Sequence, residues 1–277
     1  MDREPGHHYC GSMDHLEHNR EAWNLLSEKG CEWTVPVSSQ TIERARRGEW
    51  DVVLTPRRKV PKSWFGELER KRVLCLASGG GQQAPVLAAA GASVVSFDLS
   101  ENQLAQDRMV AEREALSLQC IQGDMADLSV FDDAQFDLIF NPVSTVFVPD
   151  VLPVWRECSR VLRPGGCLLS GFMNPGFFLF DHEPLGGSED LVVKYSLPYS
   201  ELESQQLSPS RREEIEGGGA LEFSHSLDTL LGGQLAAGFV IAGFYEDWWR
   251  DEETPLNRFS PTSMATRAIR LESSRGT

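Results

Sequence analysis

Residues 73–83 read Val73-Leu74-Cys75-Leu76-Ala77-Ser78-Gly79-Gly80-Gly81-Gln82-Gln83. The first four residues are a short apolar run that predicts a buried strand, and the glycines after them predict a tight turn. A helix of small residues is expected next, over residues 82–90, with Pro85 in its first turn. A strand, a glycine-rich turn and a helix in this order let backbone N–H groups approach a ligand closely. Many nucleotide-binding folds share this arrangement, so the loop alone does not identify the ligand.

Segments with the patterns of strands and helices alternate over residues 72–174, which we expect to form the core. The strands are expected at residues 73–76, 92–98, 120–122, 136–140 and 167–172, the helices at 100–117 and 151–162, and a turn at 163–166. Ser100 and Gln103 have the spacing of a capping box at the start of the first of these helices. Strands that alternate with helices over short loops pair in parallel through right-handed crossovers. The predicted fold class is therefore α/β.

The N-terminal segment, residues 1–71, lacks enough regular apolar pattern for a core of its own. Helices are expected at residues 15–29 and 39–47, and Ser39 is the expected N-cap of the second. We expect the segment to pack over the open edge of the sheet.

The C-terminal third of the chain divides into two parts. Residues 175–226 are rich in Pro, Gly, Glu and Ser and are interpreted as an insertion on the substrate side. Residues 227–277 return to the alternating pattern, with a helix at 227–237 and strands at 239–245 and 264–271. They are expected to complete the sheet.

The chain of 277 residues carries a formal net charge of −15. No basic run offsets this charge, which argues against a nucleic-acid partner and favours a small molecule. No stretch approaches the roughly 20 apolar residues that span a bilayer, and the N-terminus lacks the apolar core of a secretory signal. We therefore expect a cytoplasmic protein with no membrane partner.

The six cysteines show no C-x-x-C spacing, and we expect them to be buried and reduced. Four of the six histidines lie between His7 and His18, with Cys10 nearby. No further ligands follow at a tight spacing, so we expect a mobile tail there and no metal site.

Four short segments follow the expected strands at the edge where such sheets bind ligands, outside the carboxyl ends of the strands. They are Ala77–Gln83, Asp98-Leu99, Asp124-Met125 and Asn141–Ser144. A carboxylate at Asp98 can accept both hydroxyl protons of a ribose, although it can also cap the following helix. Asp124 can accept the exocyclic amine of an adenine whose ring lies on Met125, or it can be a turn residue.

Together these residues resemble the class I S-adenosylmethionine-dependent methyltransferases. The match covers residues 71–174 and extends to the helix and strand at 227–245. It rests on the glycine-rich loop, the acid at Asp98, the Gly-Asp-Met segment at 123–125, and the Arg-Pro-Gly-Gly turn at 163–166. The resemblance implies S-adenosyl-L-methionine as cofactor and a Rossmann-like sheet, mostly parallel with an antiparallel edge strand. It also implies a helical N-terminal segment and an insertion after the fifth strand.

Two positions depart from the family pattern, which usually has an acid where Cys75 stands and a glycine where Ala77 stands. Another group must then serve the methionine end of the cofactor, and the candidates are Gln82, Gln83 and the N-terminal segment. Ala77 is expected to crowd the turn slightly. The loop as a whole resembles that of a bacterial subgroup without an assigned substrate.

The resemblance assigns twelve residues of this chain to the cofactor. They are Ala77, Ser78, Gly79, Gly81, Gln82, Gln83, Asp98, Leu99, Gln103, Asp124, Met125 and Asn141.

No residue stands out as the catalytic group. His225 and Tyr195 are candidates for a general base, and His225 is equally a candidate for an ordinary hydrogen-bonded core histidine. Asn141–Ser144 half matches the Asn-Pro-Pro-aromatic motif of enzymes that methylate amide or amine nitrogens. The aromatic residues that either wall the acceptor pocket or form core are Trp23, Trp33, Trp64, Phe147, Phe177 and Phe178. Trp248 and Trp249 are expected to pack as a pair at the sheet edge.

We predict a methyltransferase that acts on a small molecule by in-line methyl transfer. One alternative is a nicotinamide-dependent oxidoreductase, because residues 79–84 partly fit the dinucleotide pattern, but the segments at 123–125 and 163–166 favour the methyltransferase. The other alternative is a non-catalytic sensor of S-adenosylmethionine, because the loop is altered and no base is evident. The sequence does not predict the oligomeric state.

Overall fold

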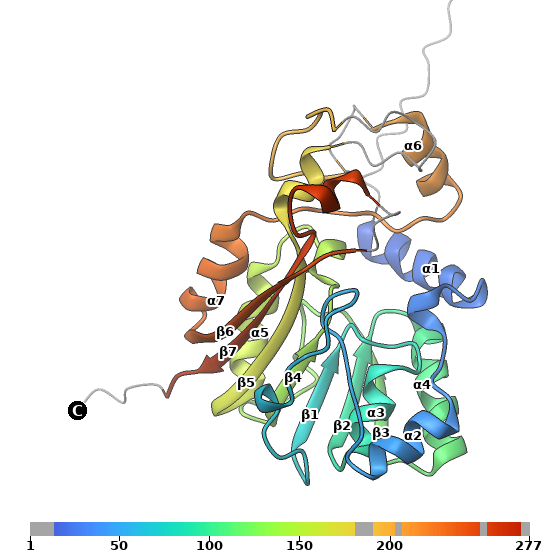
Figure 1. Ribbon diagram of the computed structural model, residues 1–277, viewed down its shortest axis with the longest axis vertical. Coiled ribbons are helices and arrows are strands. Elements are labelled where there is room, and N and C mark those ends of the chain that lie inside the picture. Colours follow the sequence, from blue (N-terminus) through green and yellow to red (C-terminus); the bar gives the residue numbers. More distant parts are fainter. Residues whose placement is uncertain (1–13, 181–190, 203–206, 250–253, 273–277) are drawn as a thin grey trace, which may run out of the picture.

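The computed structural model describes residues 14–180, 191–202, 207–249 and 254–272. Figure 1 shows one twisted sheet with helices packed on both of its faces. The sheet has seven strands in the order β3-β2-β1-β4-β5-β7-β6. They are Arg72–Leu76 (β1), Ser93–Asp98 (β2), Leu118–Gln122 (β3), Phe136–Asn141 (β4), Leu162–Met173 (β5), Phe239–Asp247 (β6) and Ser263–Arg270 (β7).

Strands β1 to β5 pair in parallel, whereas β7 runs antiparallel to both β5 and β6. The predicted α/β class, a Rossmann-like and mostly parallel sheet with an antiparallel strand at its far side, is confirmed. The strand order reverses between β1 and β4. In such sheets the ligand binds at this point, outside the carboxyl ends of the strands.

Helices pack on both faces of the sheet. The α-helices are His15–Glu28 (α1), Ser39–Arg46 (α2), Gln83–Ala89 (α3), Glu101–Glu114 (α4), Leu152–Val161 (α5), Pro209–Glu216 (α6) and Gly233–Ala236 (α7). Short 3-10 helices are Glu32–Thr34 (η1), Lys62–Trp64 (η2), Thr145–Phe147 (η3), Pro175–Leu179 (η4) and Pro255–Arg258 (η6). Buried side chains of α2, α3 and α4 pack on one face, and those of α5 pack on the other.

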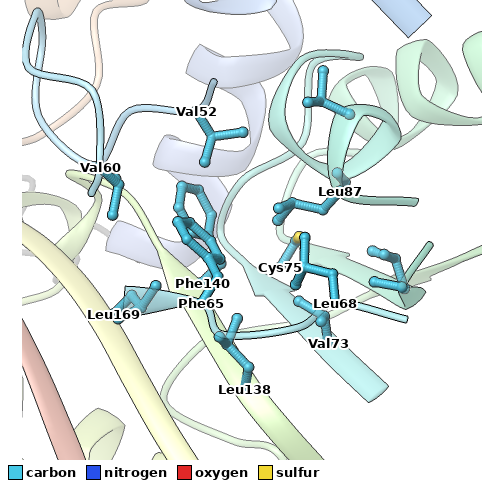
Figure 2. Close-up of a cluster of buried hydrophobic side chains, with 14 of the residues drawn as sticks. Val52, Val60, Phe65, Leu68, Val73, Cys75, Leu87, Leu138, Phe140 and Leu169 are labelled. Carbon is cyan, nitrogen blue, oxygen red and sulfur yellow. The ribbon is translucent and has the colours of Figure 1, made fainter. Parts of the chain in front are cut away.

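The N-terminal segment covers part of that first face. Figure 2 shows Val52 and Phe65 from this segment packed with Val73 of β1 and Phe140 of β4. The segment crosses the sheet so closely that a Cβ atom at Gly171 of β5 would lie 2.0 Å from a backbone oxygen of the segment. The expectation that it packs over the open edge is met only by Trp64, whose ring centroid lies 5.2 Å from that of Tyr245 on the edge strand β6, whereas most of its apolar residues are buried against the middle of the sheet.

The helix starts follow their capping residues. The Ser100 hydroxyl accepts the N–H of Gln103 at 3.2 Å, as the capping pattern predicted. Helix α4 ends at Glu114, earlier than expected, because Ala115 has a left-handed φ of 51°. The N-cap of α2 is Ser38 and not Ser39, because Ser39 is already the first helical residue.

The Arg163–Gly166 turn lies within the bounds of β5. Phe136 of β4 pairs with Leu162, and Leu138 pairs with Cys167. The four residues between the two β5 partners therefore bulge out of the ladder, and Gly165 has a φ of 74° that suits glycine.

The segments after β5 have the expected order. The described parts of residues 175–226 hold η4 and α6. The helix expected at 227–237 is a π-helical turn, Asp228–Gly232 (η5), followed by α7. Strands β6 and β7 then complete the sheet.

The cysteines are only partly as expected. Cys75, Cys158 and Cys167 are free and buried, whereas Cys31 and Cys120 are free but partly exposed. His7, His8 and Cys10 lie outside the described residues. Within the described ranges, no three metal-binding side chains gather, and none of the helices is long and apolar enough to cross a membrane.

Candidate active site

A pocket opens outside the carboxyl ends of β1, β2 and β4, where the strand order reverses. Most of the residues assigned to the cofactor line it. Five come from the glycine-rich loop, and five come from the ends of β2 and β3 and the start of α4: Ala77, Ser78, Gly79, Gln82, Gln83, Asp98, Leu99, Gln103, Asp124 and Met125.

The three glycine N–H groups of the loop all donate within the protein. Gly79 donates to Asp98 Oδ2 at 2.9 Å, and Gly81 donates to Asp107 Oδ1 at 2.8 Å. The N–H of Gly80 donates to the Gln103 carbonyl at 3.0 Å. The loop is therefore fixed to β2 and α4, and no glycine N–H is left for a phosphate.

Ala77 turns the chain from β1 into the loop with a φ of 46°. An alanine in this left-handed region costs about 1 kcal/mol, because its Cβ approaches the following carbonyl. The crowding expected at this position is thus a backbone strain.

Asp98 lies at the end of β2 with both oxygens aimed at N–H groups. Oδ2 accepts Gly79, and Oδ1 accepts Ser100 at 2.9 Å. Burial raises the pKa of Asp98, and these hydrogen bonds oppose that rise. Each carboxylate oxygen has a second lone pair, so both can still accept a ribose hydroxyl.

Besides Thr55 Oγ1, two polar atoms of the pocket lining are buried without a hydrogen-bond partner in the described part of the chain, namely Ser78 Oγ and Gln103 Oε1. Buried polar atoms in native proteins are almost always hydrogen-bonded. These two atoms therefore point to a polar ligand at the loop.

The turn after β3 is shaped for close packing. A Cβ atom at Gly123 would lie 2.2 Å from the Phe97 ring, so only glycine fits there. Asp124 Oδ1 accepts the N–H of Ala126 at 3.0 Å, which is the turn role considered for this residue. Asp124 and Met125 also line the pocket, so the adenine assignment stays open to test.

Gly81 and Asn141 do not line the pocket. Asn141 is fully buried, and its side chain ties β4 to its neighbours. Its Nδ2 donates to the Leu76 carbonyl at 3.0 Å and to Ser144 Oγ at 2.8 Å, while Oδ1 accepts Ser170 Oγ at 3.0 Å. Because Asn141 is buried and does not line the pocket, its side chain does not face the position where the Asn-Pro-Pro-aromatic motif would hold a planar nitrogen.

His225 and Tyr195 also lie outside the pocket lining. His225 Nε2 lies 2.9 Å from the Thr145 carbonyl, and burial lowers the pKa of this histidine. Tyr195 packs against Tyr199, with ring centroids 5.0 Å apart. The structure brings neither candidate base into the site.

Much of the remaining pocket lining is aromatic or apolar. Trp23 packs edge-on against Phe147 at 5.1 Å, and both line the pocket together with Trp33. Trp64, Phe177 and Phe178 do not line it. Trp249 does line it and packs on Phe177 at 5.0 Å, so Trp248 and Trp249 do not form the expected pair.

Of the residues that α1 contributes to this lining, the sequence pointed to Trp23 but not to Leu16 and Asn19, and it did not point to residues 53–56. Asn24 of α1 accepts the Ser100 hydroxyl at 2.6 Å, which joins α1 to the start of α4. The only available signal was the apolar spacing within α1, which does not reveal what the helix faces.

A family model described as "Methyltransferase domain" matches residues 74–170. An uncharacterized methyltransferase of Bacillus subtilis, YbaJ, is 50% identical over 256 residues, covering 92% of this chain and 98% of its own length. The chain belongs to the class I S-adenosylmethionine-dependent methyltransferases.

Solved structures share the fold of this methyltransferase at low sequence identity. A S-adenosylmethionine-dependent methyltransferase from Listeria monocytogenes, described as putative, has a TM-score of 0.61 at 18% identity over 76% of this chain and 95% of its own. The 1,6-didemethyltoxoflavin-N1-methyltransferase of Burkholderia thailandensis, with bound 1,6-didemethyltoxoflavin and S-adenosylhomocysteine, has a TM-score of 0.56 at 13% identity, over 97% of this chain and 94% of its own.

S-adenosylmethionine is the cofactor of this methyltransferase, and the residues present fit it. Asp98 offers acceptors for a ribose, and Ser78 and Gln103 offer unpartnered polar atoms beside the loop. The geometry disfavours the dinucleotide alternative, because a pyrophosphate at this loop would meet the carboxylate of Asp98 and no free glycine N–H.

Proposed function

We propose that the methyltransferase methylates a small, uncharged and largely apolar molecule by in-line displacement. The aromatic and apolar part of the lining carries this proposal, because the described residues that line the pocket include no Lys, Arg or His. Burying an anionic acceptor there without a counter-charge would cost on the order of several kcal/mol, and a cationic acceptor would face the positive sulfur of the cofactor. The net charge of −15 likewise disfavours an acceptor in nucleic acid.

When bound, S-adenosylmethionine supplies a methyl group on a positively charged sulfur; a lone pair of the acceptor forms the new bond to the methyl carbon, and the electron pair of the broken carbon–sulfur bond stays on sulfur. The residues of the chain position the two reactants. Asp98 would hold the ribose, and Met125 would lie against the adenine. Trp23, Phe147 and Trp249 hold the acceptor in line and exclude water.

The site favours acceptor atoms that need no strong base. Asp98 and Asp124 are the ionisable residues of the described lining, and both lie on the cofactor side. A ring nitrogen or another group with an available lone pair reacts without proton removal beforehand, and its proton passes to water after transfer. A structural neighbour that is an N1-methyltransferase with a bound small molecule supports this choice.

Incubation of the protein with S-adenosylmethionine labelled on its methyl group and a cell extract tests the proposal. We expect label in small molecules that partition into organic solvent at neutral pH. Label in precipitated protein or nucleic acid, or in anionic metabolites alone, would contradict it. Cofactor binding without any labelled product would support the non-catalytic sensor instead.

One substitution distinguishes binding of the acceptor from binding of the cofactor. Trp249→Ala should raise the KM of the labelled acceptor about tenfold or more, because it removes a large aromatic contact. The dissociation constant of S-adenosylmethionine should not change, since Trp249 packs on Phe177 and is not one of the residues assigned to the cofactor.

A further inference from the structure

Asp107 is a buried carboxylate directly beneath the glycine-rich loop. It lies on α4 and is fully buried. Oδ1 accepts the Gly81 N–H at 2.8 Å, and Oδ2 accepts the Ser96 hydroxyl at 2.6 Å. The residue does not line the pocket, so it can act on a ligand only through the loop and through its charge.

Arg108, the basic residue next to Asp107 in the sequence, forms an ion pair with a different acid. Arg108 Nη1 pairs with Glu101 Oε1 at 2.7 Å, and its side chain is 41% exposed. Its charge favours ionised Asp107 only weakly, because water screens it.

The other groups that face Asp107 are neutral or acidic. Cys75 on β1 and Cys120 on β3 have thiol pKa values raised by burial and by the Asp107 charge, so both stay protonated near neutral pH. Asp98 at the end of β2 is a second acid. The underside of the loop thus holds two carboxylates and no paired cation among these groups.

We propose that Asp107 is a positioning residue for the sulfonium cofactor, which holds the loop through Gly81 and supplies negative charge that favours the cationic S-adenosylmethionine over the neutral sulfur of S-adenosylhomocysteine. This inference rests on the methyltransferase function. It explains the cysteine in β1, because a second acid at Cys75 would face Asp107 in a buried site and repel it. Gln82 and Gln83, the residues expected to replace the missing acid, are uncharged amides and cannot supply this charge.

Asp107 changes between its neutral and its ionised form near neutral pH. Burial raises its pKa to about 7, opposed by the bonds from Ser96 and Gly81. A cation in the pocket favours the ionised form and lowers this pKa in the complex. The affinity for S-adenosylmethionine should therefore rise as pH rises through about 7 and fall as pH drops.

Calorimetric titration of the full chain with S-adenosylmethionine and with S-adenosylhomocysteine, from pH 6 to pH 8.5, measures this preference. The two ligands share the amino and carboxylate groups, so the ratio of their dissociation constants cancels those titrations. We expect the preference for S-adenosylmethionine to grow roughly three- to tenfold across this range, which corresponds to a pKa displaced by about half to one unit.

Asp107→Asn should hold that ratio at its low-pH value at every pH. Asparagine can still accept the Gly81 N–H, and its amide can donate to Ser96 Oγ, so the loop keeps its shape. Ser96→Ala keeps the charge but removes a bond that lowers the pKa of Asp107, so the midpoint should move to higher pH.

A ratio that is independent of pH in the natural protein, or a pH-dependent ratio that survives Asp107→Asn, would overturn the proposal. If Asp107→Asn does not fold, the midpoint of Ser96→Ala decides, and an unmoved midpoint overturns the proposal as well. Failure of both ligands to bind the natural protein is a distinct result, because it would remove the methyltransferase function itself.

Discussion

Asn19 of α1, which lines the pocket, and Leu221 exchange two hydrogen bonds. The Leu221 N–H donates to Asn19 Oδ1 at 2.7 Å, and Asn19 Nδ2 donates to the Leu221 carbonyl at 3.1 Å. The same nitrogen donates to the Phe147 carbonyl at 3.1 Å. Because Asn19 is only 2% exposed, its whole side chain serves to hold α1 against the acceptor wall.

Asn19→Ala should lower the free energy of unfolding by about 3 kcal/mol, because it leaves a buried N–H and buried carbonyls without partners. Urea denaturation measures this loss. Asn102→Ala is the control, since Asn102 also bonds to α1 but near the surface, and it should cost about 1 kcal/mol or less. Equal effects of the two variants would show that the Asn19 bonds do not hold α1.

Asp98→Ala should weaken S-adenosylmethionine binding by about a hundredfold, because hydrogen bonds to a charged group are worth about 1.5–3 kcal/mol each. Isothermal titration calorimetry gives the dissociation constant. Asp127→Ala removes an exposed carboxylate outside the pocket and should leave the constant unchanged. An unaltered constant for Asp98→Ala would mean that the ribose binds elsewhere.

Ala77→Gly should stabilise the protein by up to about 1 kcal/mol. The relief of left-handed strain at a φ of 46° exceeds the added entropy of the unfolded chain. Ala115→Gly, at a φ of 51°, should act in the same direction. Ala88→Gly within α3 should instead destabilise by about 1 kcal/mol. Thermal unfolding compares the three, and a loss of stability in Ala77→Gly would refute the strain at this turn.

His225→Gln should keep methyl transfer and change only the pH dependence of stability. Burial lowers the pKa of His225 below its ordinary value of 6.5, so the folded protein holds the neutral ring. As pH falls below 6.5, the unfolded chain takes up a proton first, and stability is lost until the lowered pKa is reached. Glutamine can donate to the Thr145 carbonyl without titrating, so urea midpoints should vary less over this range. Loss of transfer at full stability would restore His225 as a catalytic candidate.

The cofactor half of the site was predictable because its residues are local to strand ends. Asp98 and Asp124 each follow an apolar run, and the alternation of strands and helices places such residues on one edge. Asp107 was not predicted, although a signal existed. It lies three residues after Leu104 and four before Ala111, on the apolar face of α4, where an acid is rarely left without a partner.

The acceptor half was not predictable in the same way. Leu16, Thr55 and Trp249 come from distant segments and meet only because the chain crosses the sheet and returns. Asn141 and His225 were candidates because of their residue types, but neither lines the pocket, and each bonds to groups inside the protein.

The segment matched by the family model, residues 74–170, contains every residue assigned to the cofactor, whereas much of the acceptor wall lies outside it. Leu16, Trp23, Trp33, Thr55, Met173 and Trp249 come from the flanks. If the proposed division of the pocket holds, substitutions in the flanks are expected to change which molecule is methylated and to leave cofactor binding intact.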